Sequence, residues 1–358
     1  MQLISSSSED WRAELGPPWS RPPAGTLDRL VVESELLAGN PLGDPVRRPL
    51  WVYRPPGVEL DHPRPLPVIY VIQGFTGQLD MWANRTFREP TYLERIDAMF
   101  ASGDCPDALV VMVDCWTAYG GSQFLDSIGT GRYQSYMCDE IVPFVDSRYP
   151  TAADRDHRGI TGKSSGGYGA MVVPMMRPDV FSALASHAGD ALFELSMTPS
   201  IAAATRTLRD DFDSSWDVYF AELAKGPDPF DFGRYAGPLE MYGYAAAYSP
   251  DTEHPGKALL PFRIEDAGLV PEIWERWLAH DPVYMAARHA DALRSMRRIY
   301  LDAGRGDEYY LDLGAQAFSR ELTKLGAEHT LELFDGKHGG ITYRYPGAIR
   351  ELVVALSD

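Results

Sequence analysis

The residues best suited to chemistry in this chain lie in the segment Gly162-Lys163-Ser164-Ser165-Gly166. An extended run (157–161) precedes it, and a run of small residues (167–171) that predicts a helix start follows it. A serine on so tight a strand-to-helix turn has strained backbone, and glycines two residues to either side remove Cβ atoms that would clash. This pattern predicts a nucleophile elbow, with the Ser164 hydroxyl exposed and the Ser165 N–H facing the same space.

The same turn has two other interpretations. A phosphate-binding loop requires a glycine five residues before Gly162, but His157 occupies that position, so this interpretation fails. A glycine-rich turn that merely packs a strand against a helix stays open on the motif alone.

Two later clusters complete a set of catalytic residue types. A turn with several carboxylates (302–311) follows the predicted strand 298–301. His338 follows the predicted strand 329–334 and is flanked by Gly336 and Gly339-Gly340, a setting that packing alone explains poorly. The chain order is therefore serine, acid, histidine, with the acid and the histidine each on a loop after a late strand.

The chain at this point resembles the putative-esterase family of α/β-hydrolases, which contains S-formylglutathione hydrolases, feruloyl esterases, enterochelin-type esterases and mycolyltransferases. The similarity runs from about Val68 to the end of the chain, and it is carried by Ile72-Gln73-Gly74-Phe75 and by residues 136–149, 162–170, 304–311 and 336–338. The resemblance implies that the acid lies three residues after a glycine, which selects Asp307 over Asp302 and Glu308. Asp302 remains an alternative if the loop is remodelled.

An oxyanion hole needs a second donor besides the Ser165 N–H, and in this fold it comes from the loop after an early central strand. Residues 67–72 predict such a strand, so we expect the Phe75 N–H to be that donor. Gln73 stands where many relatives have histidine, which leaves a side-chain role in substrate binding open. Trp82, shortly after this loop, is either a pocket wall or a core residue.

The pattern of elements predicts an α/β fold. Residues 26–56 contain two alternating strands that favour an antiparallel leading edge, and from Val68 onward strands alternate with helices, which predicts a mostly parallel sheet with helices on both faces. Residues 1–25, rich in Ser, Pro and charge, are interpreted as a tail or loose arm before a catalytic domain over 26–358. Residues from about 190 to 292 contain many aromatics and no convincing core strand, so we expect an insertion that caps the crevice.

Three polar residues near the ends of predicted strands are further candidates for substrate contact. Tyr119 and Gln123 lie in a segment with a Gly-Gly pair directly after the predicted strand 109–114, so we expect them at the rim of the crevice. Asp190 follows the predicted strand 181–186, where it either orients the cap or substrate or serves as a helix N-cap.

Composition limits the partners. The formal charge is −18, from 51 acidic and 33 basic side chains, which argues against nucleic acid and anionic membranes. The three cysteines have no C-x-x-C spacing and no metal-binding motif is present, so we expect no metal and no cofactor. The N-terminus has no signal-peptide pattern and the apolar runs are too short to span a membrane, which predicts a cytoplasmic protein. A homo-oligomer stays open.

The function expected is therefore that of a serine esterase, which hydrolyses a small or medium carboxylic ester through an acyl-enzyme. An acyltransferase with the same triad, in which an alcohol or thiol replaces water, is the alternative. A non-catalytic binding module is a third reading, and the intact serine, acid and histidine argue against it. The sequence does not determine the acyl or alcohol specificity.

Overall fold

A computed structural model describes residues 1–9, 23–61, 64–86 and 89–357 of the chain. Within these residues, nine strands form one sheet in the order β1-β2-β3-β5-β4-β8-β9-β10-β11. The strands of this sheet are β1 (Gln2–Glu9), β2 (Thr26–Glu33), β3 (Arg47–Arg54), β4 (Val68–Ile72), β5 (Leu109–Val113), β8 (Arg158–Lys163), β9 (Ala183–His187), β10 (Arg298–Gly304) and β11 (Thr330–Phe334). A short separate hairpin is formed by β6 (Asp126–Ser127) and β7 (Gly131–Arg132).

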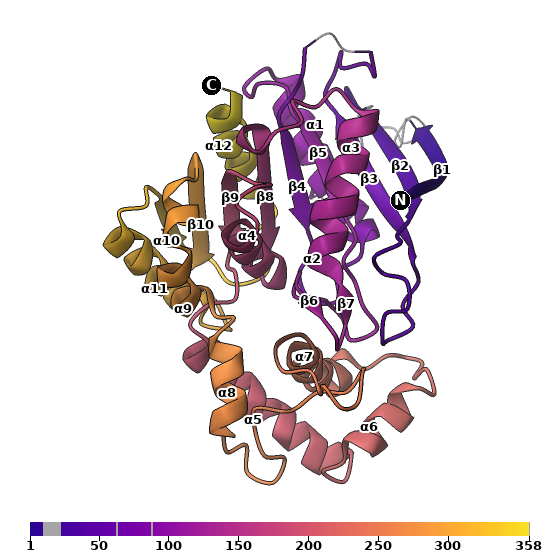
Figure 1. Ribbon diagram of the computed structural model, residues 1–358, viewed down its shortest axis with the longest axis vertical. Coiled ribbons are helices and arrows are strands. Elements are labelled where there is room, and N and C mark those ends of the chain that lie inside the picture. Colours follow the sequence, from indigo (N-terminus) through magenta and orange to yellow (C-terminus); the bar gives the residue numbers. More distant parts are fainter. Residues whose placement is uncertain (10–22, 62–63, 87–88, 358) are drawn as a thin grey trace.

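Helices connect these strands and cover both faces of the sheet (Figure 1). The α-helices are α1 (Tyr92–Ala101), α2 (Tyr133–Ser135), α3 (Val142–Arg148), α4 (Ser165–Met176), α5 (Phe193–Asp211), α6 (Trp216–Leu223), α7 (Phe232–Tyr248), α8 (Pro271–Leu278), α9 (Pro282–Met285), α10 (Ala290–Arg294), α11 (Leu311–Leu325) and α12 (Tyr345–Ser357). The shorter helical segments are η1 (Leu79–Ala83), η2 (Tyr136–Ile141), η3 (Arg155–His157) and η4 (Ala286–His289).

The sheet has the predicted mixed order. The first three strands run antiparallel to their neighbours, whereas β5, β4 and β8 to β11 are parallel. The expected α/β-hydrolase fold is thereby confirmed. Because the carboxyl ends of parallel strands lie at one edge of a sheet, the loops after β4, β8, β10 and β11 meet there.

Alternation along β4 shows why its apolar run forms a central strand. All five of its residues are buried, with Tyr70 and Ile72 in the apolar cluster that contains α3 and α4, and Ile69 and Val71 in the cluster that contains α1 and α12. Successive side chains of a strand point to opposite faces, so a strand with helices on both sides needs a continuous apolar run.

The N-terminal segment corrects one expectation. Gln2–Glu9 is not a loose arm but the edge strand β1, which pairs antiparallel with β2. An edge strand is held chiefly by its backbone hydrogen bonds to the neighbouring strand, so its side chains need no apolar alternation. The serines of this segment therefore gave no strand signal. Residues 10–22, the rest of the expected tail, lie outside the described residues.

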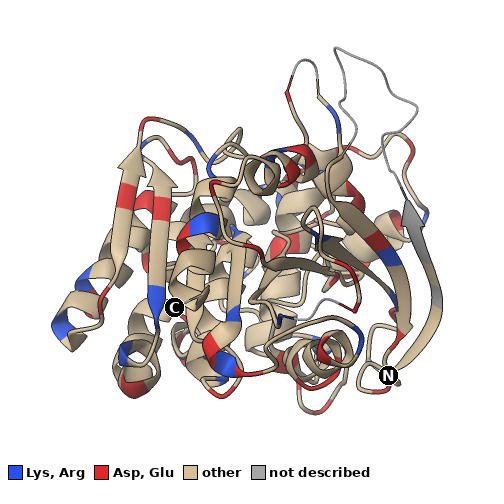
Figure 2. Ribbon diagram, turned by 90° about the horizontal axis from the view of Figure 1, so that it is seen from above, with Lys and Arg blue, Asp and Glu red and all other residues tan. Residues whose placement is uncertain are grey.

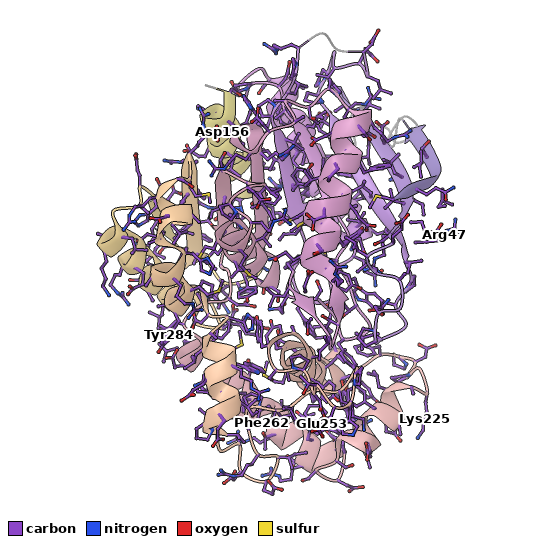
Figure 3. The ribbon with its side chains drawn as sticks, viewed as in Figure 1. Arg47, Asp156, Lys225, Glu253, Phe262 and Tyr284 are labelled. Carbon is purple, nitrogen blue, oxygen red and sulfur yellow. The ribbon has the colours of Figure 1, made fainter. Side chains whose placement is uncertain are left out.

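The segment expected to be an insertion is helical and packs at one end of the sheet. Helices α5 to α8, residues 193–278, form a layer below the strands (Figure 1). Phe262 lies in this layer, whereas Asp156, just before β8, lies near the opposite end of the molecule (Figure 3). The carboxyl end of β8 therefore points toward the helical layer. After α8 the chain returns to the flank of the sheet, where α9 and α10 contact α4 and α11, so the layer ends near residue 278 rather than 292.

Acidic and basic side chains are interspersed over the same elements, and Figure 2 shows both kinds on strands and helices alike. The structure describes no helix that is both long and apolar enough to cross a lipid bilayer.

Candidate active site

Ser164 occupies the turn between β8 and α4 with the backbone expected of an elbow. Its φ is +59° and its ψ is −127°, a conformation that non-glycine residues rarely adopt. The flanking glycines make this turn feasible. A Cβ on Gly162 would lie 2.5 Å from the backbone of Gly166, and one on Gly166 would lie 2.6 Å from the carbonyl oxygen of Ile72.

Three side chains from separate loops form a hydrogen-bonded chain at this turn. The Oγ of Ser164 lies 3.1 Å from Nε2 of His338, and Nδ1 of His338 lies 2.8 Å from Oδ2 of Asp307. Asp307 is buried, and its other oxygen accepts the N–H of Tyr309 at 2.9 Å. The ring of Tyr309 packs edge-on against the imidazole of His338, with ring centroids 4.9 Å apart. The arrangement can pass a proton from the serine to the histidine.

The other carboxylates of the acid loop have different partners. Asp302 is fully buried and lies 2.7 Å from Nδ1 of His187 and 3.0 Å from Nε of Arg344. Burial raises the pKa of Asp302, but His187 and Arg344 outweigh this effect and leave the pKa below its usual value. Glu308 accepts the backbone N–H of His338 at 3.0 Å rather than a ring nitrogen. Asp307 alone of these three carboxylates therefore contacts the imidazole of His338.

The loop after β4 lies against the elbow. A Cβ on Gly74 would be 3.0 Å from the carbonyl oxygen of Lys163 and 3.3 Å from Cβ of Ser164, so this glycine permits the close approach. Phe75 and Ser164 line the same cavity. In the described part of the chain, neither the Phe75 N–H nor the Ser165 N–H donates a hydrogen bond. Both N–H groups therefore lack a hydrogen-bond acceptor among the described residues.

The cavity has a volume of about 240 Å³ and contains Ser164 and His338 in its lining. Helices α5 and α7 of the lower layer supply one wall, with Ser196, Met197 and Ser200 from α5 and Phe232, Glu240 and Tyr244 from α7. Ligand pockets usually measure about 300–1,000 Å³, so this cavity suits a small substrate.

The expected substrate contacts divide into two groups. Trp82 and Asp190 line the cavity. Trp82 is also a core residue, 3% exposed and in contact with Tyr92, whose ring centroid lies 4.4 Å away. Asp190 is not the N-cap of α5. The carboxylate of Asp281 accepts the N–H groups of Leu192 and Phe193 instead.

The structure does not bring Gln73, Tyr119 or Gln123 to this cavity. Gln73 and Gln123 are buried behind the loop after β4, where they line a separate small void. Nε2 of Gln123 donates to the Tyr248 hydroxyl at 2.8 Å. The Tyr119 hydroxyl donates to the carbonyl oxygen of Gly256 at 3.1 Å, and its ring packs on Tyr242 of α7. Tyr119 and Gln123 therefore pack against the helical layer.

Three groups near Ser164 were not found from the sequence, namely Tyr244, Glu240 and Lys163. The Tyr244 hydroxyl lies 2.9 Å from Oγ of Ser165 and 3.1 Å from a carboxylate oxygen of both Asp190 and Glu240. Burial raises the pKa of Asp190 to about 6, although the charge of His338 and hydrogen bonds from Tyr244, Ser165 and Gln123 oppose this effect. Burial and the charge of Asp190 raise the pKa of Glu240 to about 7. Lys163 also lines the cavity, and burial lowers its pKa against the opposing charges of Asp307 and Glu308.

One signal in the sequence does mark Glu240. It is the single charged residue between Arg234 and Asp251, in an otherwise apolar and aromatic helix. A lone carboxylate on such a helix is costly to bury, and its presence indicates a specific partner or function.

Several solved structures share this fold. A ferulic acid esterase has 17% sequence identity and a TM-score of 0.57, and the alignment covers 93% of this chain and 98% of that one. The fluorophosphonate-binding serine hydrolase FphF of Staphylococcus aureus has 14% identity and a TM-score of 0.55, with 93% and 99% covered. An S-formylglutathione hydrolase of Agrobacterium tumefaciens has 16% identity and a TM-score of 0.53, with 100% and 99% covered.

The sequence itself also matches a family. The model of the family described as putative esterase aligns with residues 46–344, which contain the elbow, the acid loop and the histidine loop. With most of its length in that match and with the fold of the esterases above, the chain belongs to the putative-esterase family and is a carboxylic-ester hydrolase.

Proposed function

We propose that the protein hydrolyses small carboxylic esters through an acyl-enzyme on Ser164. The observation that carries this proposal is the chain of contacts from Ser164 through His338 to Asp307, at 3.1 Å and 2.8 Å, in the lining of a cavity. His338 takes the serine proton as Oγ attacks the ester carbonyl, and then gives it to the departing alcohol. Water attacks the acyl-enzyme by the same route and releases the acid.

Asp307 holds the imidazole in the tautomer that accepts a proton at Nε2 and stabilises the cation that forms. Its burial supports this role, because a carboxylate shielded from water interacts more strongly with the imidazolium. The N–H groups of Phe75 and Ser165 stabilise the oxyanion of the tetrahedral intermediate. The absence of other acceptors for these two donors among the described residues supports this assignment.

The helical layer α5 to α8 acts as the cap that shapes the pocket. Support comes from the residues of α5 and α7 in the cavity lining. The layer is not a detachable lid, because Met197, Met241 and Tyr244 belong to the same apolar cluster as Ile72 and Tyr168. Substitution of single lining residues is therefore a better probe of specificity than deletion of the segment.

We also propose a cytoplasmic location and a reduced state for the cysteines. Cys105, Cys115 and Cys138 are all buried and unpaired. Burial raises the pKa of Cys105 and of Cys138 to about 12, so neither thiol is activated.

The decisive test is Ser164→Ala, with hydrolysis of p-nitrophenyl acetate and covalent labelling by a fluorophosphonate as readouts. We expect a loss on the order of a million-fold in kcat and no labelling, with the unfolding transition unchanged. Ser147→Ala, which removes an exposed serine at the end of α3, is the matched control and should retain both signals. More than a few per cent of activity after Ser164→Ala would refute the assignment.

A further inference from the structure

Two carboxylates in the wall of the cavity share a single phenol. The Tyr244 hydroxyl lies 3.1 Å from Oδ2 of Asp190 and 3.1 Å from Oε1 of Glu240. A hydroxyl has one hydrogen, so it can donate to only one of these two oxygens. The other oxygen then faces the lone pairs of the phenol, unless a further proton or positive charge is present.

Asp190 is the better satisfied of the two. It is 4% exposed and also receives hydrogen bonds from Ser165 and Gln123. Glu240 has no hydrogen bond from a described residue other than Tyr244, and part of its surface is open to the cavity that it lines. Glu240 is therefore the carboxylate that needs a further proton or a positively charged partner.

No side chain in the described ranges supplies that charge. Neither Asp190 nor Glu240 has a Lys or Arg within ion-pair distance there, although the surface carries many such pairs. Lys163 lines the same cavity, but the charges it interacts with are those of Asp307 and Glu308. His338 is the other basic group facing Asp190, and during the reaction it holds the serine proton.

A second residue in the cavity lining also has a polar group without a hydrogen-bond partner among the described residues. Trp82 is 3% exposed, and its indole N–H has no acceptor among the described residues. Buried polar groups in proteins are almost always hydrogen-bonded. The lining therefore contains a carboxylate with no basic partner and a tryptophan whose buried N–H has no acceptor among the described residues, and these favour a polar ligand over a plain hydrocarbon chain.

We propose that the ester substrate carries an ammonium group and that Glu240, supported by Tyr244 and Asp190, binds it beside Ser164. This inference rests on the proposed ester hydrolysis and specifies its substrate class. The ammonium supplies the missing positive charge and donates to Glu240, while the ester carbonyl lies at Ser164. Tyr244 links the two positions, because its hydroxyl contacts both Glu240 and Ser165 at hydrogen-bond distance.

Binding of an ammonium should displace a proton from Glu240. Burial and the charge of Asp190 keep the pKa of Glu240 near 7, so in the free protein this carboxyl is largely protonated at slightly acidic pH. A cation alongside favours the ionised form. The protonated carboxyl and the ammonium then give an ion pair and one proton, which passes to solvent. The other titratable groups near Glu240 are Asp190, Tyr244, Tyr309 and His338.

Matched esters test the inference. On the alcohol side, 3-(aminomethyl)phenyl acetate is compared with 3-ethylphenyl acetate, and on the acyl side methyl 3-(aminomethyl)benzoate is compared with methyl 3-ethylbenzoate. Within each pair only an ammonium replaces a methyl group. We expect kcat/KM to favour the ammonium ester in at least one pair by about 10- to 100-fold, as for a hydrogen bond to a charged group. The pair that responds identifies which side of the ester carries the cation.

The variant Glu240→Gln keeps the shape of the side chain and removes its charge, so we expect this preference to fall to within about threefold of unity. Glu272→Gln removes the same charge from an exposed position on α8 and should preserve the preference. A wild-type ratio near one in both pairs, or a preference that survives Glu240→Gln, would overturn the inference.

A binding measurement separates this inference from the proposed hydrolysis. In isothermal titration near pH 7, benzylammonium should bind the wild-type protein at least about tenfold more tightly than benzyl alcohol. Titrations in buffers of different ionisation enthalpy should show proton release, and Glu240→Gln should abolish it. If Ser164→Ala keeps its esterase activity while proton release is observed, the catalytic assignment fails and the ammonium site stands. Equal affinity for benzylammonium and benzyl alcohol would refute the ammonium site, whether or not Ser164→Ala abolishes esterase activity.

Discussion

The three carboxylates of the acid loop provide a sharp test of the proposed triad, because each contacts a different group. Asp307 accepts from Nδ1 of His338, Glu308 accepts from the backbone N–H of the same residue, and Asp302 pairs with His187 and Arg344. Asp307→Asn replaces the acceptor with an amide that favours the wrong imidazole tautomer, so we expect kcat to fall about ten-thousand-fold with little change in stability.

The other two substitutions should act differently. Asp302→Asn removes the carboxylate that contacts both His187 and Arg344, and breaking a buried pair costs about 3–5 kcal/mol, so we expect lower stability with activity per folded molecule within about tenfold of wild type. Glu308→Gln weakens one exposed hydrogen bond and removes an exposed ion pair with Lys337, so it should cost about 1 kcal/mol or less in stability, with kcat reduced less than about tenfold.

The assay must count folded sites separately from turnover. Burst titration with p-nitrophenyl acetate gives the concentration of active sites where acylation is fast enough, and urea unfolding followed by fluorescence gives the stability of each variant. An Asp302→Asn protein that is stable but inactive, together with an active Asp307→Asn protein, would show that the wrong carboxylate has been assigned.

Two further predictions concern the elbow and the acidic pair. Gly162→Ala places a Cβ 2.5 Å from the backbone of Gly166, so we expect a loss of about 1–3 kcal/mol in urea unfolding together with reduced kcat, whereas Gly339→Ala, where a Cβ meets nothing within 4 Å, should be nearly neutral in stability. Because burial raises the pKa of Glu240 from 4.5 to about 7, the folded protein holds a proton that the unfolded chain releases, and stability should fall as pH rises through this window. Glu240→Gln lacks this ionisation. The free energy of unfolding of the variant minus that of wild type should therefore rise by about 1–3 kcal/mol between pH 4 and pH 8 in urea unfolding. Parallel pH profiles of the two proteins would contradict the raised pKa.

The sequence predicted those parts of the fold that depend on local patterns. The apolar run of β4 and the glycines around Ser164 each satisfy a constraint within a few residues, namely burial on both faces of a strand and close backbone approach at a turn. The order of serine, acid and histidine then followed from the positions of strand ends. The sequence did not predict β1, because its serines form a strand only through pairing with β2, and residues 10–22 separate the two strands in the sequence.

Side chains on loops were harder to place, because their direction depends on distant segments. Tyr119 and Gln123 follow β5 as expected, but they contact α7 of the helical layer and do not line the cavity that contains Ser164. Asp190 was placed near the crevice, yet its partners Tyr244 and Glu240 come from a helix some fifty residues later. No local pattern encodes such a contact.

The helical layer therefore contributes more than a cover. Ser165, whose N–H is the proposed oxyanion donor, has its hydroxyl hydrogen-bonded to Tyr244 of that layer, and Tyr244 in turn contacts both Asp190 and Glu240. Two hydrogen bonds, both made by Tyr244, separate Glu240 from Ser165. A ligand that changes the charge of Glu240 therefore acts close to the turn that contains Ser164. In the proposed mechanism, Tyr244 thus joins substrate recognition to catalysis, and this coupling would account for a costly pair of carboxylates beside a serine that needs neither of them for its chemistry.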